Sequence, residues 1–81
     1  MSAGKKATYT VVFEKEPEGG YTVLVPALAG LVTFGRTLRE ARTMAADAIL
    51  CHLEGLRKDG EPIPRETEVD VERLEVIVPA A

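Results

Sequence analysis

Few residues in this 81-residue chain could perform covalent chemistry. The single cysteine, Cys51, and the single histidine, His52, are neighbours in sequence, and neighbouring side chains on a helix diverge by about 100° and do not pair. One cysteine and one histidine also cannot complete the usual zinc ligand sets. We therefore predict no catalytic residue, no metal site and no cofactor, and we expect His52 to pack against the core.

Carboxylates are the other candidates for chemistry. Glu14, Glu16 and Glu18 follow one another at the end of a predicted strand and in the turn after it, and Asp47 lies on a predicted helix. A two-metal nuclease needs several acidic side chains that converge from different elements. Because a turn and an outer helix face both point to solvent, we interpret these residues as solvated charges and keep a metal-dependent nuclease only as a third hypothesis.

The net charge of −3 is distributed unevenly. Residues 1–58 carry eight basic and six acidic side chains, which gives +2, whereas residues 59–81 carry two basic and seven acidic ones, which gives −5. Such a chain is a poor general binder of nucleic acid, because phosphate binding requires a basic face. It suits a basic partner protein. The predicted partner contacts are the acidic residues of the turn and of a later connector: Glu14, Glu16, Glu18, Glu61, Glu66 and Glu68.

Three strands are predicted in the first part of the chain. β-Branched and aromatic residues alternate over 7–15 and again over 21–25, and the Pro- and Gly-containing residues between them favour a hairpin turn. Residues 26–30 contain proline and glycine and indicate a bend. Residues 31–34 then form a short third strand.

One long helix follows these strands. Thr37 and Glu40 fit a capping box at its start, and Gly60 can supply a left-handed exit after Lys58. An apolar stripe with alanine at its centre indicates that the helix covers one face of the sheet closely. The stripe consists of Leu38, Ala41, Ala45, Ala48, Ile49, His52, Leu53 and Leu56.

A fourth strand is predicted within residues 68–78. The alternation changes phase between Val71 and Leu74, which indicates a bulge or a late start near Arg73. A right-handed crossover places this strand beside the first one. The sequence thus predicts a single α+β domain over 1–81, a two-layer β-β-β-α-β fold with a four-stranded mixed sheet of order 3-2-1-4 covered on one face by the helix.

Self-association is expected because a domain of this size has a thin core. Because an intramolecular disulfide bond and a zinc site are excluded, oligomerisation is the remaining way to stabilise such a small core. The sheet face away from the helix is half apolar, and Leu50 lies among polar residues on the helix. We predict a homo-oligomer, a dimer or a tetramer, with contacts at Val12, Leu24 and Leu50.

Nothing in the sequence directs the chain to a membrane. No apolar run approaches the roughly 18 residues of a membrane span, and the basic start is not followed by the apolar block of a signal peptide. Together with a free cysteine, this predicts a cytoplasmic protein.

The order and spacing of these segments resemble the HicB family of antitoxins. The likeness begins with Tyr-Thr-Val-Val-Phe-Glu-Lys at 9–15, an acidic Gly-Gly turn and Tyr-Thr-Val-Leu-Val-Pro at 21–26. It continues through the Pro-Ala-Leu-Ala-Gly segment, the helix, and the Asp-Gly-Glu-Pro-Ile-Pro connector at 59–64. The resemblance covers about residues 8–78.

The resemblance implies a partial ribonuclease-H-like fold and a non-enzymatic role. A HicB-like antitoxin binds and inhibits HicA, a small basic ribonuclease toxin, by covering its catalytic histidine and RNA surface. Full-length relatives often append a DNA-binding domain, and only two residues follow Pro79 here, so we expect no direct DNA binding. The alternative is a stand-alone oligomeric HicB-like binding module with no toxin partner.

Overall fold

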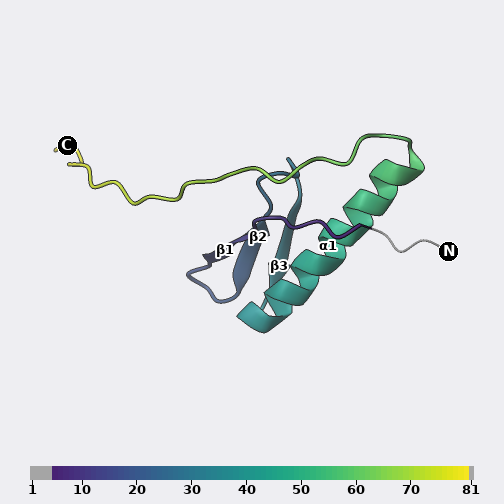
Figure 1. The fold of residues 1–81 in the computed structure, drawn as a ribbon. Helices are drawn as coiled ribbons and strands as arrows, with labels where there is room; N and C mark the ends of the chain where they lie inside the picture. The colour runs from purple at the N-terminus through teal and green to yellow at the C-terminus, as the bar shows by residue number, and fades with distance from the viewer. Residues whose placement is uncertain (1–4, 81) are drawn as a thin grey trace.

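The computed structural model describes residues 5–80 and places three β-strands before one α-helix (Figure 1). The strands are β1 (Val12–Lys15), β2 (Tyr21–Leu24) and β3 (Val32–Gly35), and the helix is α1 (Leu38–Lys58). The strands pair antiparallel in the order β1-β2-β3. The α+β class, the three-strand part of the predicted order and the single covering helix are confirmed.

The β1–β2 turn closes where the sequence places its glycines. The amide of Glu16 donates to the carbonyl of Gly20 at 2.9 Å, and the amide of Gly19 donates back to the carbonyl of Glu16 at 3.0 Å. Gly19 and Gly20 have φ angles of 106° and 84°, in the region that favours glycine. This turn fixes the register in which Lys15 lies opposite Tyr21.

The strand register divides the sheet into two faces. Phe13, Val23 and Thr33 form a row across the three strands on the face toward α1. Two further rows lie on the opposite face, which we call the outer face: Val12, Leu24 and Val32, then Glu14, Thr22 and Phe34. The helix leaves this outer face uncovered.

α1 begins and ends as predicted. The Thr37 hydroxyl accepts the amide of Glu40 at 3.1 Å and caps the first turn. At the other end, Gly60 adopts a φ of 73° and its amide donates to the carbonyl of Arg57 at 3.1 Å. The basic residues of the last turn lie at the negative end of the helix dipole.

Small residues let α1 pack closely on β2 and β3. Ala41 and Ala45 are buried against Val23, and the partly buried side chains of Val11, Phe13 and Tyr21 surround them. A Cβ atom placed on Gly35 would overlap the backbone nitrogen of Ala41. The helix therefore lies too close to β3 for any side chain at this position.

β1 is shorter than the predicted strand over 7–15. Val12 pairs with Leu24, the last residue of β2, so residues 7–11 extend beyond the end of the neighbouring strand. Their composition is that of a strand, but a strand forms only beside a hydrogen-bonding neighbour.

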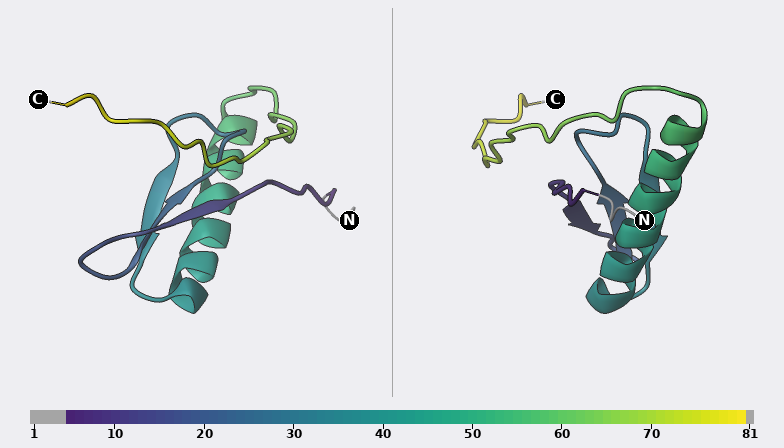
Figure 2. Two further views of the ribbon diagram at one scale, coloured as in Figure 1. Left: turned by 90° about the vertical axis from the view of Figure 1, so that its left-hand side faces the viewer. Right: turned by 45° about the vertical axis from the view of Figure 1, so that its right-hand side comes forward.

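The predicted fourth strand is not formed in the single chain, and the four-stranded order 3-2-1-4 is not confirmed. Residues 61–80 contain no strand. Residues 63–66 lie beside α1 and the start of the chain, and the residues after them run away from the sheet and helix as an extended segment (Figures 1 and 2). Because of this segment, the molecule measures 63 Å in one direction and 25 and 19 Å in the others. We call residues 68–78 the C-terminal arm. Its residues alternate as those of a strand do, but it has no neighbouring strand along its path.

Candidate partner-binding site

The predicted acidic contacts lie in two separate places. Glu14, Glu16 and Glu18 lie on β1 and in the β1–β2 turn, whereas the other three predicted contacts lie in the connector and arm that follow α1: Glu61, Glu66 and Glu68. The turn and the connector are at opposite ends of the sheet (Figures 1 and 2). The six carboxylates therefore do not form one surface.

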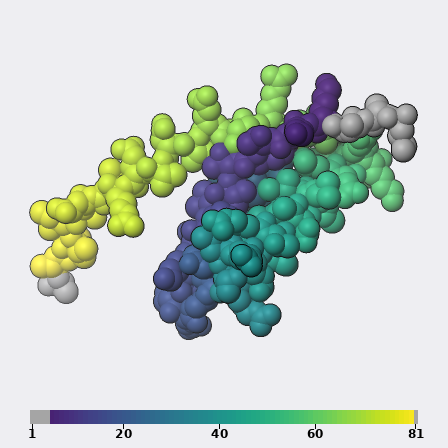
Figure 3. Space-filling view, turned by 60° about the horizontal axis from the view of Figure 1, so that its bottom comes forward, coloured from purple at the N-terminus to yellow at the C-terminus, as the bar shows by residue number. Residues whose placement is uncertain are grey.

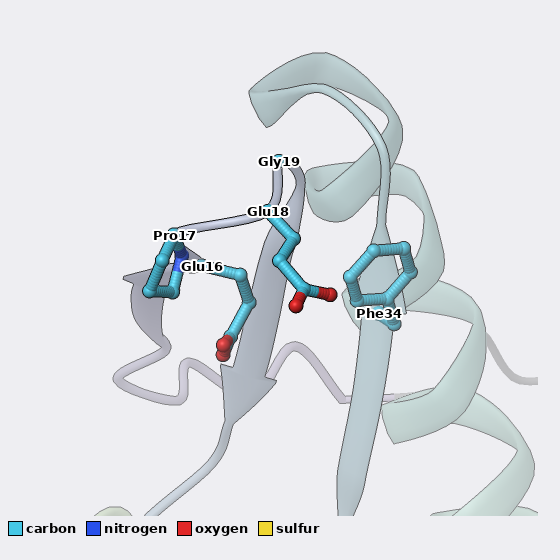
Figure 4. Close-up of a pocket in the computed structure, with 5 residues that line it drawn as sticks. All are labelled: Glu16, Pro17, Glu18, Gly19 and Phe34. Atoms are coloured by element: carbon cyan, nitrogen blue, oxygen red, sulfur yellow. The ribbon is translucent and has the colours of Figure 1, made fainter.

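The acids of the turn line a hollow beside an exposed aromatic ring (Figure 4). The hollow has a volume of about 520 Å³, and five residues line it: Glu16, Pro17, Glu18, Gly19 and Phe34. The carboxylate of Glu18 is turned toward the ring of Phe34. Phe34 is 47% exposed, which is unusual for a residue of this size in a small sheet. We call this feature the acidic hollow.

One carboxylate of the acidic hollow is fixed and the other is free to adapt. The hydroxyl of Thr22 donates to Oε1 of Glu16 at 2.6 Å, and Glu16 is half-buried. Glu18 is exposed. Glu14 is also exposed on the outer face, in the same cross-strand row as Phe34. Glu16 and Glu18 thus lie around the hollow that Phe34 lines, and Glu14 lies two strands away from Phe34 on the same side of the sheet.

This arrangement is suited to binding a cation on another protein. An arginine side chain pairs with carboxylates through its planar guanidinium and also stacks on aromatic rings. Such an interaction is recognition, since it needs no bond to be made or broken. The acidic hollow can therefore accept a basic side chain from a partner.

Phe34 was not among the predicted site residues. The sequence at 31–34 shows two alternating faces, but both carry apolar residues, so the pattern does not say which face meets the helix. The close contact of Gly35 with Ala41 decides this, and it turns Phe34 outward. A glycine two residues before the helix cap was the signal of this orientation.

Glu66 serves to attach the connector to the start of the chain. The hydroxyl of Thr10 donates to Oε2 of Glu66 at 2.6 Å, and the hydroxyl of Tyr9 donates to the carbonyl of Pro64, also at 2.6 Å. The hydrogen bonds from Thr10 lower the pKa of Glu66, and the amide of Thr67 adds to this effect. Glu61 and Glu68 are exposed and stay predicted contacts.

The remaining candidates for chemistry are not brought together. His52 is half-buried on the side of α1 that faces the sheet, as predicted, and Cys51 is exposed beside it. Among residues 5–80, no three histidine, cysteine, aspartate or glutamate side chains are placed so that they could hold a metal ion. The same part of the chain contains no helix long and apolar enough to cross a membrane.

The predicted oligomer contacts lie on two different surfaces. Val12 and Leu24 are half-buried on the outer face, where Val32 beside them is 58% exposed. Leu50 is 59% exposed on α1. These three residues cannot form a single contact patch, and their role in assembly stays a prediction.

Comparison with known proteins identifies the family. Residues 9–76 match the family described as the HicB-like antitoxin of bacterial toxin–antitoxin systems. This chain belongs to the HicB-like antitoxin family. The match spans β1, β2, β3 and α1, and it continues through most of the C-terminal arm.

Several curated proteins are similar along most of this HicB-like chain. The UPF0150 protein Ta0767 of Thermoplasma acidophilum is 41% identical over 63 residues, which are 78% of this chain and 91% of the relative. The UPF0150 protein ssr1765 of Synechocystis is 37% identical over 86% of this chain and 87% of its own length. Antitoxin HicB 1 of Photorhabdus laumondii is 36% identical over 89% of this chain, but the similar region is only 46% of that antitoxin.

Family membership supports an antitoxin role in a toxin–antitoxin system. The kind of partner that this role implies is a toxin protein. The family suggests a regulatory role for this chain.

Proposed function

We propose that this protein is an antitoxin that binds and inhibits a ribonuclease toxin of the HicA type. The observation that carries the proposal is the family match over residues 9–76, together with an acidic hollow that suits a basic partner. A HicA-type toxin, as the sequence resemblance implies, is small and basic. The sign of the charge on this chain is the sign that such a toxin requires.

The acidic hollow is the proposed contact with the toxin. A basic side chain that binds RNA phosphates can equally bind the carboxylates of Glu16 and Glu18 and lie against Phe34. A basic side chain of the toxin that is bound in this way can no longer bind RNA. Inhibition is then steric and electrostatic, since the antitoxin covers the RNA-binding surface and no chemical step is needed.

The proposal places the protein in the cytoplasm, where a ribonuclease toxin meets its RNA substrates. It does not require the antitoxin itself to bind DNA. The alternative, a stand-alone oligomeric module without a toxin, uses the same fold and differs in lacking the partner.

The decisive experiment uses a HicA-type protein from the same genome as this chain. Titration calorimetry measures its binding to the antitoxin, and an RNA-cleavage assay measures its activity with and without an excess of the antitoxin. Binding together with suppressed cleavage supports the proposal. If the two proteins do not bind at micromolar concentration and cleavage is unchanged, the stand-alone alternative replaces it.

Variants of Glu18 test the acidic hollow itself. Glu18 is better suited than Glu16, which also accepts a hydrogen bond from Thr22 within the fold. Glu18→Gln should weaken toxin binding by about threefold to tenfold, and Glu18→Arg by considerably more, since a like charge then faces the toxin. The matched control is Asp47→Asn, which removes one charge from the exposed outer side of α1. Equal effects of E18Q and D47N would move the toxin contact away from the hollow.

A further inference from the structure

The C-terminal arm carries apolar side chains that no residue of 5–80 covers. Leu74, Val76 and Val78 share one face of the arm and are 76–81% exposed, and Ile77 on the other face is 94% exposed. Figure 3 shows the arm projecting from the body of the molecule. A soluble domain rarely exposes such a continuous apolar segment unless it is an interaction site.

The body of the same chain has an open strand edge. β1 pairs with β2 on one side, and no strand lies on its other side within residues 5–80. Residues 7–11 prolong this edge beyond the end of β2. An edge of this kind accepts an added strand where its amides and carbonyls lack partners, and the connector contacts it at Tyr9 and Thr10.

A groove lies next to this edge. It has a volume of about 1080 Å³ and runs between the second half of α1, residues 5–9 and residues 63–66. Its apolar lining includes Leu50, Leu53 and Ile63. The connector forms one wall of the groove and then leaves it after Glu66, so the arm of the same chain does not fill it.

Charge favours the arm as the occupant of this groove. The groove has four basic lining residues, Lys5, Lys6, Arg57 and Arg65, against two acidic ones, Glu54 and Glu66. The arm has four acidic residues and one basic residue, which gives it a charge of −3. The arm and the groove are therefore complementary in charge as well as in apolar character.

We propose that two copies of this chain form a dimer by exchanging their C-terminal arms. Residues 68–78 of each copy pair with the free edge of β1 and residues 7–11 of the other copy, and Leu74, Val76 and Val78 cover its groove. Each chain has one arm and one groove, so a two-fold arrangement satisfies both and is closed. An arm of 11 residues spans about 36 Å, long enough to follow the whole edge.

The exchanged strand would complete each sheet. With the partner's arm beside β1, the strand order becomes the predicted 3-2-1-4, in which the fourth strand comes from the other chain. The partial ribonuclease-H-like sheet is then a property of the dimer. This inference does not depend on the toxin, since it concerns the association of this chain with itself.

Size-exclusion chromatography with light scattering tests the dimer. The chain of 8.8 kDa should elute with twice that mass at about 10 μM. The double variant Leu74→Glu with Val76→Glu should weaken the dimer by at least about 100-fold and elute as a monomer. A monomeric wild-type protein at 100 μM, or a dimer unaffected by this double variant, would overturn the proposal.

A matched control tests whether the dimer interface lies on the arm or on the outer face. Val32→Glu adds a charge at an apolar residue of the outer face that is 58% exposed and should leave the dimer intact. If V32E gives a monomer instead, the interface lies on the outer face and arm exchange is wrong. Circular dichroism checks that each variant keeps its helix, so that a monomer reflects lost association and not lost folding.

Mixing two monomeric variants tests the exchange directly. Leu50→Glu places a charge in the groove at an exposed position and leaves the arm unchanged. The double arm variant has the opposite defect, an intact groove and a damaged arm. Mixed together, they should form a heterodimer with one intact arm–groove contact, whereas each variant alone stays monomeric. Failure of the mixture to associate would contradict exchange between chains.

Discussion

Single side chains in this protein have distinct roles that their residue type does not reveal. Glu16, Glu18 and Glu66 are all acidic residues of connecting segments, and each does something different. Glu16 is fixed by Thr22, Glu18 faces Phe34, and Glu66 attaches the connector through Thr10. The charge of a segment thus predicts the sign of its partner, but the hydrogen bonds decide which carboxylate is available.

The hydrogen bonds to Glu66 make the attachment of the connector to the start of the chain dependent on pH. The pKa of Glu66 in the folded chain lies below its ordinary value of 4.5, chiefly because Thr10 donates to the carboxylate. Because the pKa of Glu66 is lowered, its hydrogen bond from Thr10 stabilises the folded chain above pH 4.5. This stabilisation is lost as the pH falls through the pKa of Glu66 in the folded chain. Thr10→Val should raise the pKa of Glu66 toward its ordinary value. An NMR titration of the Glu66 carboxyl measures this, and an unchanged pKa in T10V would remove Thr10 as the cause.

Gly20 positions Phe34 beside the acidic hollow. A Cβ atom at Gly20 would overlap the ring of Phe34, whereas one at Gly19 would meet nothing within 4 Å. Both glycines have positive φ, so Gly20→Ala and Gly19→Ala each cost about 1–2 kcal/mol of backbone strain. Only G20A should also displace the ring and weaken toxin binding by about threefold or more. Calorimetric titrations of the two variants make the comparison, and equal affinities would show that Phe34 does not contact the toxin.

At the scale of elements, small residues allow α1 to pack closely on the sheet. Ala41 and Ala45 face Val23, and Gly35 has no space for a side chain. The position of the helix therefore depends on the absence of a side chain at Gly35. Another glycine, Gly55, lies within α1 and has open space around it.

The two glycines should respond to alanine in opposite directions. Gly35→Ala should destabilise the fold by about 2 kcal/mol or more, because backbone atoms of Ala41 must move to make room. Gly55→Ala should stabilise it by about 0.5–1 kcal/mol, since alanine has the higher helix propensity. Urea denaturation followed by circular dichroism gives both values. A neutral G35A would show that the helix does not contact β3 as closely as described.

The elements differ in how far the sequence could predict them. The bounds of α1 follow from local signals, Thr37 at one end and Gly60 at the other, so the prediction was confirmed to the residue. A strand depends on a neighbour elsewhere in the chain. For that reason the strand over 7–15 was predicted too long, and the strand over 68–78 was predicted where the single chain has none. The outward turn of Phe34 was missed because it depends on contact between β3 and α1.

At the scale of the whole molecule, two acidic regions are assigned to two separate proposed surfaces. The acids of the β1–β2 turn belong to the proposed toxin contact, and those of the arm belong to the proposed contact with a second copy. The charge of −5 on residues 59–81 was predicted to mark the partner contact, whereas the proposed toxin contact lies at the hollow of the β1–β2 turn. A dimer joined by its arms leaves both acidic hollows open.

The central claim is that this HicB-like chain neutralises a ribonuclease toxin. Titration calorimetry of the intact antitoxin with a HicA-type protein from the same genome tests this most directly. The account predicts one toxin bound per antitoxin chain with a dissociation constant of about 100 nM or lower, and RNA cleavage suppressed at the same ratio. No heat of binding at micromolar concentration, with RNA cleavage at its full rate in the presence of excess antitoxin, would contradict it.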